Sequence, residues 1–307
     1  MITKEKIRFF APDCLIAASG LLCGLAYRLY MNMKGYKKCK IREKKLFVLG
    51  TGPSFKQTIE KYEKILSSNP CAVVNGFATN LIYEKIQPKY YCLADPAYFT
   101  PYHELSERNK GVVDILRNSL LNKTSWPITF IFPASGRGSE LQIALEQIKG
   151  ADFLYYNNKG NAVVMPDAPL KFICWNMQIV APLCQTVLNT ILNIAIASKV
   201  KDIYLVGADT SWIKTYEIDQ TDNTLYSKDE HFYGVNRIPI YKDEINKIKQ
   251  ELHSELMLVS KALKAYWTLD AFAKFNNVHL YNASEYSWID ALERYSLSKF
   301  PINKEHD

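Results

Sequence analysis

Short apolar runs alternate with longer amphipathic segments from residue 45 onward, and most of the apolar runs stop at or just before a polar residue. These runs predict buried strands that begin at Lys45, Cys71, Tyr90, Ile128, Ile203 and Val278. Helical patterns include Asn80–Ile86, Glu140–Ile148, Gln185–Ala197 and Asp243–Phe272. The alternation predicts an α/β fold with a Rossmann-like, doubly wound and mostly parallel sheet. The irregular, aromatic stretch Leu154–Met177 is interpreted as a β-ribbon or an acceptor-binding region.

The turn after the first strand is a candidate phosphate site, and it consists of Gly50, Thr51, Gly52, Pro53 and Ser54. Its two glycines permit close approach of a ligand to the backbone, and Ser54 can cap the helix that follows. Free N–H groups at a helix start favour a phosphate or carboxylate. The spacing differs from the dinucleotide fingerprint GxGxxG. A tight strand–helix turn without a ligand is the alternative interpretation.

Polar or small residues also follow the other predicted strands. These are Asn75, Asp95, Gly207 and Asp209, and Thr186 stands at the start of the helix Gln185–Ala197. Ligands of open α/β sheets bind beyond the carboxyl ends of the strands, so these side chains are expected to border one nucleotide site. Asn189 and Asn193 are interpreted as packing amides of the same helix, because buried amides usually find a local partner.

A polar loop rich in aromatic residues is predicted after Asp209, and residues 210–233 are interpreted as a mobile lid. No Asp-x-Asp metal motif precedes a strand end, so no metal ligands are predicted. Trp212, Tyr216 and Tyr226 are candidate donors to a leaving phosphate in place of a cation. His231 is the candidate general base, since its ordinary pKa lies near neutral pH.

The charge of the chain is concentrated at its N-terminal end. Residues 1–45 carry 11 Lys or Arg against three acids, and the remaining residues carry 27 against 28. A near-neutral body argues against a nucleic-acid partner. The seven cysteines include no CxxC pair, which indicates a reducing compartment without a disulfide framework or a zinc site.

An uncharged run, CLIAASGLLCGLAY, lies between Asp13 and Arg28 and is 14 residues long. A spanning helix needs about 20 apolar residues. We therefore expect residues 1–44 to form a monotopic anchor with a polybasic tether, and this places the protein at the cytoplasmic face of the bacterial inner membrane. Two alternatives stay open, a short tilted spanning helix and a helix packed on the protein itself. Residues 45–307 are predicted to form one catalytic domain, the lid included.

Several motifs resemble the bacterial sialyltransferases of glycosyltransferase family 42. GTGPSF at residues 50–55 is similar to the family's GNGPSL opening, and Asn193–Asp209 (NIAIASKVKDIYLVGAD) resembles its AVAIALGYKEIYLSGID. EHFYG at Glu230–Gly234 is similar to its SHYIG. The order and spacing agree over most of residues 45–285. The opening and the GAD strand end also occur in related Rossmann-like proteins, among them flagellin-glycosylation proteins that handle nonulosonic acids and an archaeal pterin diphosphokinase.

The resemblance implies inverting, metal-independent transfer from a nucleotide-activated nonulosonic acid, usually CMP-sialic acid. It also implies that residues 45–307 form a single nucleotide-binding domain of GT-A-like type. His231 matches the histidine that deprotonates the acceptor hydroxyl. Asn75 matches the asparagine at the second strand end, and Thr186 matches the threonine at the helix start. Of the two tyrosines that bind the leaving phosphate in that family, one falls at or beside Tyr216.

The chain departs from the family pattern at four places. The other phosphate-binding tyrosine falls on Ser211 or Trp212. Thr51 and Asp95 stand where the family has asparagine, and Cys184 stands where it has arginine.

The sequence thus predicts a sialyltransferase-like enzyme that elaborates a surface glycan or lipid-linked glycan, with a CMP-activated sugar as donor substrate and no other cofactor. Another nucleotide-dependent transferase remains an alternative, either for a different sugar nucleotide or as a diphosphokinase with a divalent ion on Asp95 and Asp209. A non-catalytic envelope scaffold is the third interpretation. Homo-oligomerisation stays open.

Overall fold

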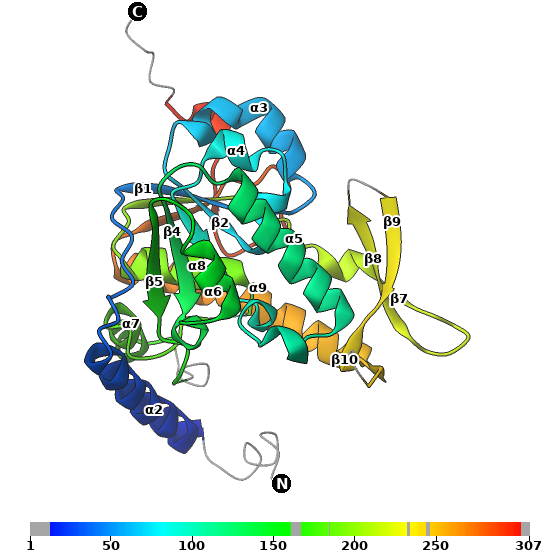
Figure 1. Cartoon of the computed structure of the whole chain (residues 1–307), viewed down its shortest axis with the longest axis horizontal. Helices are drawn as coiled ribbons and strands as arrows, with labels where there is room; N and C mark the ends of the chain where they lie inside the picture. Colours follow the sequence, from blue (N-terminus) through cyan, green and yellow to red (C-terminus); the bar gives the residue numbers. More distant parts are fainter. Residues whose placement is uncertain (1–12, 161–166, 184, 232–233, 244–245, 302–307) are drawn as a thin grey trace, which may run out of the picture.

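One large parallel sheet organises the molecule. The computed structural model describes residues 13–160, 167–183, 185–231, 234–243 and 246–301 (Figure 1). Within these residues an eight-stranded sheet has the order β13-β12-β6-β1-β2-β3-β4-β5, and every neighbouring pair is parallel. The strands are β1 (Lys45–Leu49), β2 (Cys71–Val74), β3 (Tyr90–Cys92), β4 (Ile128–Pro133), β5 (Ala151–Tyr156), β6 (Asp202–Val206), β12 (His279–Asn282) and β13 (Glu293–Arg294). The predicted α/β fold with a parallel sheet is confirmed.

The strand order reverses beside β1. The chain builds β2 to β5 outward on one side of β1, and β6, β12 and β13 follow on the other side. The turns after β1 and β6 therefore flank the switch point of the sheet, where a crevice forms in doubly wound folds.

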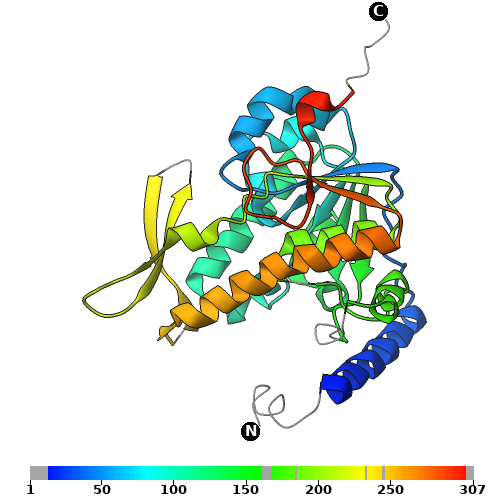
Figure 2. The same cartoon turned by 180° about the vertical axis from the view of Figure 1, so that it is seen from behind.

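Helices cover both faces of the sheet (Figures 1 and 2). Leu46 and Val48 point into one core, and Phe47 and Leu49 point into the other, because successive side chains of a strand alternate in direction. The first core includes residues of α7 (Pro169–Asn176), α8 (Val187–Ala197) and α9 (Leu252–Phe275), and the second includes residues of α3 (Phe55–Ser67), α4 (Tyr83–Ile86), α5 (Glu107–Lys123) and α6 (Glu140–Leu145). Burial on both faces explains the near-continuous apolar runs of the strands.

Residues 212–239 contain a short helix and a three-stranded antiparallel sheet, and the prediction of a loop was wrong here. η5 (Trp212–Thr215) leads into β7 (Tyr216–Ile218), β8 (Leu225–His231) and β9 (Gly234–Pro239). Asp219 N donates to Thr224 O at 2.9 Å, and the positive φ of Asn223 (57°) closes the turn between β7 and β8. We call the sheet of β7, β8 and β9 the lid sheet, and both views show it apart from the central sheet (Figures 1 and 2).

Two further element predictions were wrong in extent. The helix predicted from Asp243 begins at Leu252, because β10 (Tyr241–Asp243) and β11 (Ile248–Lys249) form a hairpin before it. The positive φ of Lys247 and the bonds from Asn246 to Asp243 make its turn. The stretch Leu154–Met177 contains the end of an edge strand, β5, and the helix α7.

The N-terminal segment packs on the body along one side. α2 (Asp13–Met33) is followed by an extended stretch in which Cys39 and Ile41 are buried, as is Met31 in the helix. Gln178 accepts from Cys39 N at 3.2 Å and donates to Cys39 O, in the manner of a neighbouring strand. No helix in the described ranges is long and apolar enough to cross a membrane.

Candidate functional site

The turns after β1 and β6 contact each other directly at the switch point. Gly50 N donates to Val206 O at 2.8 Å, and Gly52 N donates to Gly207 O at 2.9 Å. A Cβ atom at Gly50 would lie 2.6 Å from Gly207 O, and one at Gly52 would lie 2.4 Å from Asp209 Oδ1. Gly207 itself has a φ of +66°, a backbone conformation that residues with a Cβ atom rarely adopt. The glycines of both turns are therefore required by the backbone contact.

Asp209 ties the second turn to the start of α3. Its carboxylate accepts from Ser54 N at 2.9 Å and from Ser54 Oγ at 2.6 Å. Burial raises the pKa of Asp209, and the two bonds from Ser54 oppose that rise. A carboxylate at a helix N-terminus is also stabilised by the helix dipole.

This bond changes the expected role of Ser54. Its side chain donates to Asp209 and makes no capping bond to α3, and the Ser54 N–H that was expected to be free is engaged. The chain's own carboxylate thus holds the N–H position that such a turn offers to a phosphate. Thr51 and Pro53, in the same turn, are exposed to solvent.

The segment after β12 supports the β6 turn from its other side. Ala208 N donates to Ser284 Oγ at 2.9 Å, and Ser287 Oγ donates to Ala208 O at 2.6 Å. Trp288 N donates to Asp209 O at 2.8 Å. These bonds leave the Gly207–Asp209 turn little freedom.

A partly unsatisfied polar cluster lies where α8 begins. Thr186 caps α8 through a capping box with Asn189. Asn189 N donates to Thr186 Oγ1, and Thr186 N donates to Asn189 Oδ1. The Asn189 side-chain nitrogen and the Gln185 side-chain oxygen are buried without a hydrogen-bond partner. These buried polar atoms could form hydrogen bonds with a ligand at this edge without first losing bound water.

Tyr266 joins this cluster from α9, and nothing in the periodic pattern of that helix distinguishes it from a core residue. Its phenol oxygen is buried and has no hydrogen-bond partner of good geometry, although Thr186 and Thr210 lie beside it. Burial raises its pKa to about 12. Thr210 has a φ of 51°, so the backbone is held in an unusual conformation next to this phenol.

Asn75 and Asp95 stand at the next two strand ends. Asn75 has a φ of 41°, and its side-chain oxygen is buried without a partner, while its backbone oxygen accepts from Tyr91. Asp95 is exposed and caps the 3-10 helix η2 (Pro96–Tyr98) by accepting from Ala97 N at 2.9 Å. Asn75 therefore borders the switch point, and Asp95 lies one strand further out.

The predicted lid residues are on η5 and the lid sheet. Trp212 opens η5 and is 41% exposed. Tyr216 donates to Glu255 Oε1 in α9 at 2.9 Å, and the Arg237 guanidinium lies 3.9 Å from the ring centre of Tyr226. His231 is the last residue of β8 and pairs with Gly234, but its side chain lies outside the described part of the structure. The tyrosines are thus engaged within the lid and with α9.

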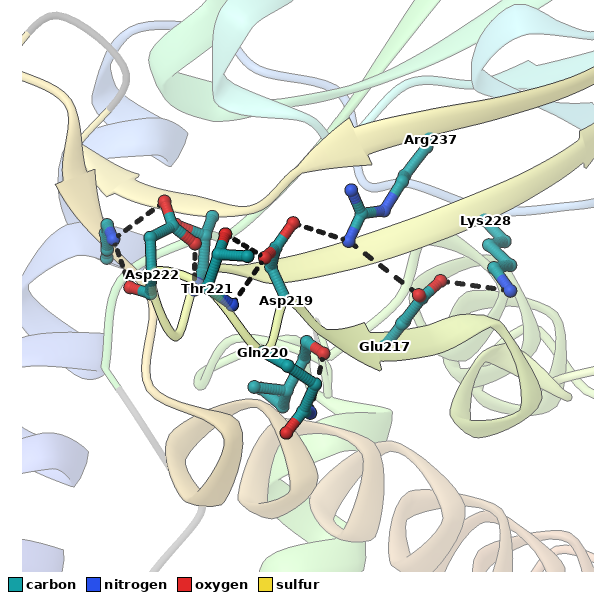
Figure 3. A network of polar contacts seen from close by, with 10 residues as sticks. Glu217, Asp219, Gln220, Thr221, Asp222, Lys228 and Arg237 are labelled. Atoms are coloured by element: carbon teal, nitrogen blue, oxygen red, sulfur yellow. Dashed lines mark hydrogen bonds and ion pairs between the residues drawn. The ribbon is translucent and has the colours of Figure 1, made fainter.

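A polar network stiffens the lid sheet (Figure 3). Arg237 lies 2.9 Å from Asp219 and 3.7 Å from Glu217, and Lys228 lies 3.0 Å from Glu217. Bonds from Thr221 and then Arg237 lower the pKa of Asp219 to about 2. Charges of both signs alternate across the hairpin, so this network favours one register of its strands.

A cationic and aromatic group lies near Asp209, and sequence reasoning missed it. Lys214 donates to the Tyr286 hydroxyl, and its ammonium lies 4.9 Å from the Tyr286 ring centre and 5.0 Å from that of Trp288. Tyr286 also lies beside Ser54, since its backbone oxygen is 3.5 Å from Ser54 Oγ. The bond from Lys214 lowers the pKa of Tyr286. The aromatic letters in EYSW after the last long strand were the available signal.

The described side chains include no group of three or more His, Cys, Asp or Glu residues placed to hold a metal ion. The two carboxylates of the diphosphokinase alternative are both engaged with the chain itself, Asp209 with Ser54 and Asp95 with Ala97.

Comparisons with known proteins give one distant structural likeness. No family model matches the sequence, and no curated protein sequence matches it. Among solved structures, the MAf glycosyltransferase from Magnetospirillum magneticum AMB-1 is similar, with a TM-score of 0.47 and 15% identity. The superposition covers 86% of this chain and 35% of that chain, so this chain spans about a third of the length of that neighbour.

Proposed function

We propose that the chain is an inverting, metal-independent glycosyltransferase that moves a nonulosonic sugar from a CMP-activated donor to a hydroxyl group of a glycan. The observation that carries this proposal is the site at the switch point. Glycine turns after β1 and β6 meet there, and buried polar atoms of Asn75, Gln185 and Asn189 lack partners around it. A nucleotide supplies donors and acceptors for such atoms.

The acidic character of the donor is supported by Lys214, Tyr286 and Trp288. A nonulosonic acid carries a carboxylate, and its CMP group carries a phosphate. An ammonium held against two aromatic rings offers such an anion a charge, and the rings offer a stacking surface to a base or sugar. Because Asp209 holds the α3 N-terminus, the charge of the leaving phosphate is assigned to Lys214 and to the phenol of Tyr266 rather than to the glycine turn alone.

The transfer itself is a single displacement. The acceptor oxygen forms a bond to the anomeric carbon as the bond from that carbon to the phosphate oxygen breaks, and CMP leaves with the bonding electrons. The hydroxyl proton goes to His231, the general base that the family resemblance suggests. His231 ends β8 in the lid sheet, so the proposal requires the lid sheet to approach the switch point when substrates bind.

The experiment is a thermal-shift panel of CMP, CMP-sugars, UDP-sugars and ATP, each with magnesium and with EDTA. Stabilisation by CMP and CMP-sugars in EDTA is the expected result. A shift that requires ATP and magnesium would identify a diphosphokinase instead. No response to any nucleotide would favour a scaffold and overturn the proposal.

The role of His231 is tested separately with His231→Ala and the matched control His253→Ala, which changes an exposed histidine in α9. His231→Ala should abolish transfer and leave the CMP thermal shift unchanged, and the control should behave as the wild type. Transfer by His231→Ala near the wild-type rate would show that another group removes the proton.

A further inference from the structure

α2 presents two opposite faces, and only one of them touches the protein. The face toward the body combines the close backbone contacts of Gly20 and Gly24 with the packed side chains of Leu21, Tyr27 and Met31. A Cβ atom added at Gly24 would lie 2.4 Å from Ile179 O, and one at Gly160 would lie 2.5 Å from Gly24 Cα. Asn157 donates to Gly24 O at 3.2 Å. These contacts fix α2 against the segments that follow β5 and α7.

The opposite face is apolar and exposed. Leu22 is 67% exposed, Leu29 is 63% exposed and Met33 is 81% exposed. Leu15 and Leu25 continue the same stripe at helical spacing, and we call these five residues the leucine face. Both views show α2 at the margin of the molecule with its outer side clear of the body (Figures 1 and 2). An exposed apolar stripe of this size on a surface helix usually marks a site where a partner or a membrane binds.

A cationic cluster borders the leucine face. Arg28 lies one turn after Leu25, and its Nη1 atom is buried without a hydrogen-bond partner. Lys38 and Lys40 are exposed in the stretch that follows the helix. Lys38 and Lys40 are two residues apart in this extended stretch, so their side chains leave it on the same side. Partial desolvation and then the like charges of Arg28 and Lys40 lower the pKa of Lys38. An anion placed among them would relieve their repulsion.

We propose that α2 is a docking surface for an anionic lipid bilayer, with the leucine face in the apolar boundary layer and the exposed Lys38 and Lys40, next to the half-buried Arg28, against lipid phosphates. A bilayer with acidic lipids supplies an apolar layer and phosphate oxygens side by side, as the helix surface requires. The helix lies along the membrane rather than across it, because its other face is held by Asn157 and Ile179.

The docking surface and the proposed catalytic site share one edge of the sheet. Asn157 directly follows β5, and Tyr36, just after α2, donates to Ala134 O directly after β4 at 3.4 Å. α2 therefore lies at the carboxyl ends of the strands, as the glycine turn does. If the proposed function holds, docking turns this edge toward acceptors carried on lipids.

The experiment measures co-sedimentation of the full chain with vesicles. Phosphatidylcholine vesicles containing phosphatidylglycerol should bind the chain, and vesicles of phosphatidylcholine alone should bind it much less. Leu22→Ser with Leu29→Ser should lower the partition coefficient roughly tenfold or more, since both side chains lose apolar contact. Leu81→Ser, at an exposed leucine before α4, is the matched control and should bind as the wild type.

The cationic cluster is tested by neutralising Arg28, Lys38 and Lys40 to glutamine. Binding to the acidic vesicles should fall roughly fivefold for each charge removed. Lys64→Gln with Lys261→Gln and Lys264→Gln removes equal charge from α3 and α9 and should bind as the wild type. Equal losses in both triple variants would overturn the proposal, because general charge would then explain binding.

Two other outcomes decide against the bilayer. Failure of the wild type to bind acidic vesicles would overturn the proposal directly. Light scattering that showed a dimer in the wild type and a monomer in the leucine variant, without vesicle binding by either, would assign the face to a second copy. The CMP thermal shift should be unchanged in the leucine variant, so failure of docking and failure of the proposed function are distinguishable.

Discussion

At the scale of single residues, close backbone contact decides what the glycine turn tolerates. Gly52 lies against Asp209, while a Cβ atom at Gly76 would have no atom within 4 Å. The two positions belong to successive strand-end turns, yet only the first is packed against another strand's turn. Glycine at Gly52 is thus a packing requirement.

Gly52→Ala should lower the free energy of unfolding by about 1–3 kcal/mol, because its methyl group must displace the Asp209 carboxylate or the backbone. Gly76→Ala should change it by less than about 0.5 kcal/mol. Denaturant melts of both variants measure the difference. Equal effects at the two positions would contradict the contact between the turns.

Tyr266 and Tyr83 are both buried phenols, but we expect loss of their hydroxyl groups to have opposite effects on stability and on CMP binding. Tyr83 shares a hydrogen bond of 2.8 Å with Thr124, while the Tyr266 oxygen has no partner of good geometry beside Thr186 and Thr210. Tyr83→Phe should cost about 1 kcal/mol of stability and leave CMP affinity unchanged. Tyr266→Phe should cost little or no stability and weaken CMP binding about fivefold, a loss of about 1 kcal/mol. Thermal melts and calorimetric titration with CMP separate the two, and unaltered CMP affinity in Tyr266→Phe would remove Tyr266 from the site.

At the scale of elements, the lid sheet depends on charged side chains more than on apolar burial. Leu225 is buried, but the network of Figure 3 is largely exposed. Its β7–β8 turn is held by Asp219, which accepts from Thr221 and contacts Arg237. Such an element opens more readily than the central sheet, and its stability should follow the charge of Asp219.

The pH dependence of the lid follows from Asp219. Its pKa is lowered from 3.8 to about 2, so the folded state binds this proton more weakly than the unfolded state does. The contribution of Asp219 is therefore complete above the unfolded value and is lost as pH falls through the folded one. Hydrogen-exchange protection of residues 217–228, corrected for intrinsic rates, should fall in that acid range before the central sheet does. Asp219→Asn should remove this step, and Asp152→Asn, at the far edge of the central sheet, should retain it.

At the scale of the whole molecule, α2 and the stretch after it belong to the folded body. Met31, Cys39 and Ile41 lie in the two cores, and the Gln178 side chain makes hydrogen bonds to both backbone polar groups of Cys39. A boundary at residue 44, drawn from charge, therefore cuts through packed structure. The helix has one side for the protein and one side free for a partner.

Asn157→Ala tests whether α2 unfolds together with the rest of the protein. Its side chain donates to Gly24 O, Gln178 O and Ile179 O, so removing it leaves buried acceptors unpaired at a cost of about 1–3 kcal/mol. Calorimetry should show one transition at lower temperature, with α2 losing exchange protection together with the body. Asn158→Ala, at a half-exposed neighbouring amide that bonds to Ser135, should lower the melting temperature much less, because water can replace its partner. An unchanged melt of Asn157→Ala would mean that α2 is held in another way.

The alternation of apolar runs determined the parallel sheet, because strands buried on both faces have a distinctive apolar signature. The same pattern located the starts of β1, β2, β3 and β4 and placed the glycine turn after the first of them. It could not resolve the lid sheet, whose strands read as polar, and it merged a hairpin into α9 because Ile245 and Ile248 fell on the helical period.

Only the tertiary structure decided which polar groups are free. Asp209 and Ser54 both looked available for a ligand in the sequence, yet they satisfy each other across 155 residues of chain. Tyr266, Lys214 and Tyr286 come to the same edge from α9, η5 and the segment after β12, and no local pattern records such a meeting. A sequence fixes local periodicity through side-chain burial, but hydrogen-bond partners far apart in the chain are chosen by the packing of the sheet and its helices.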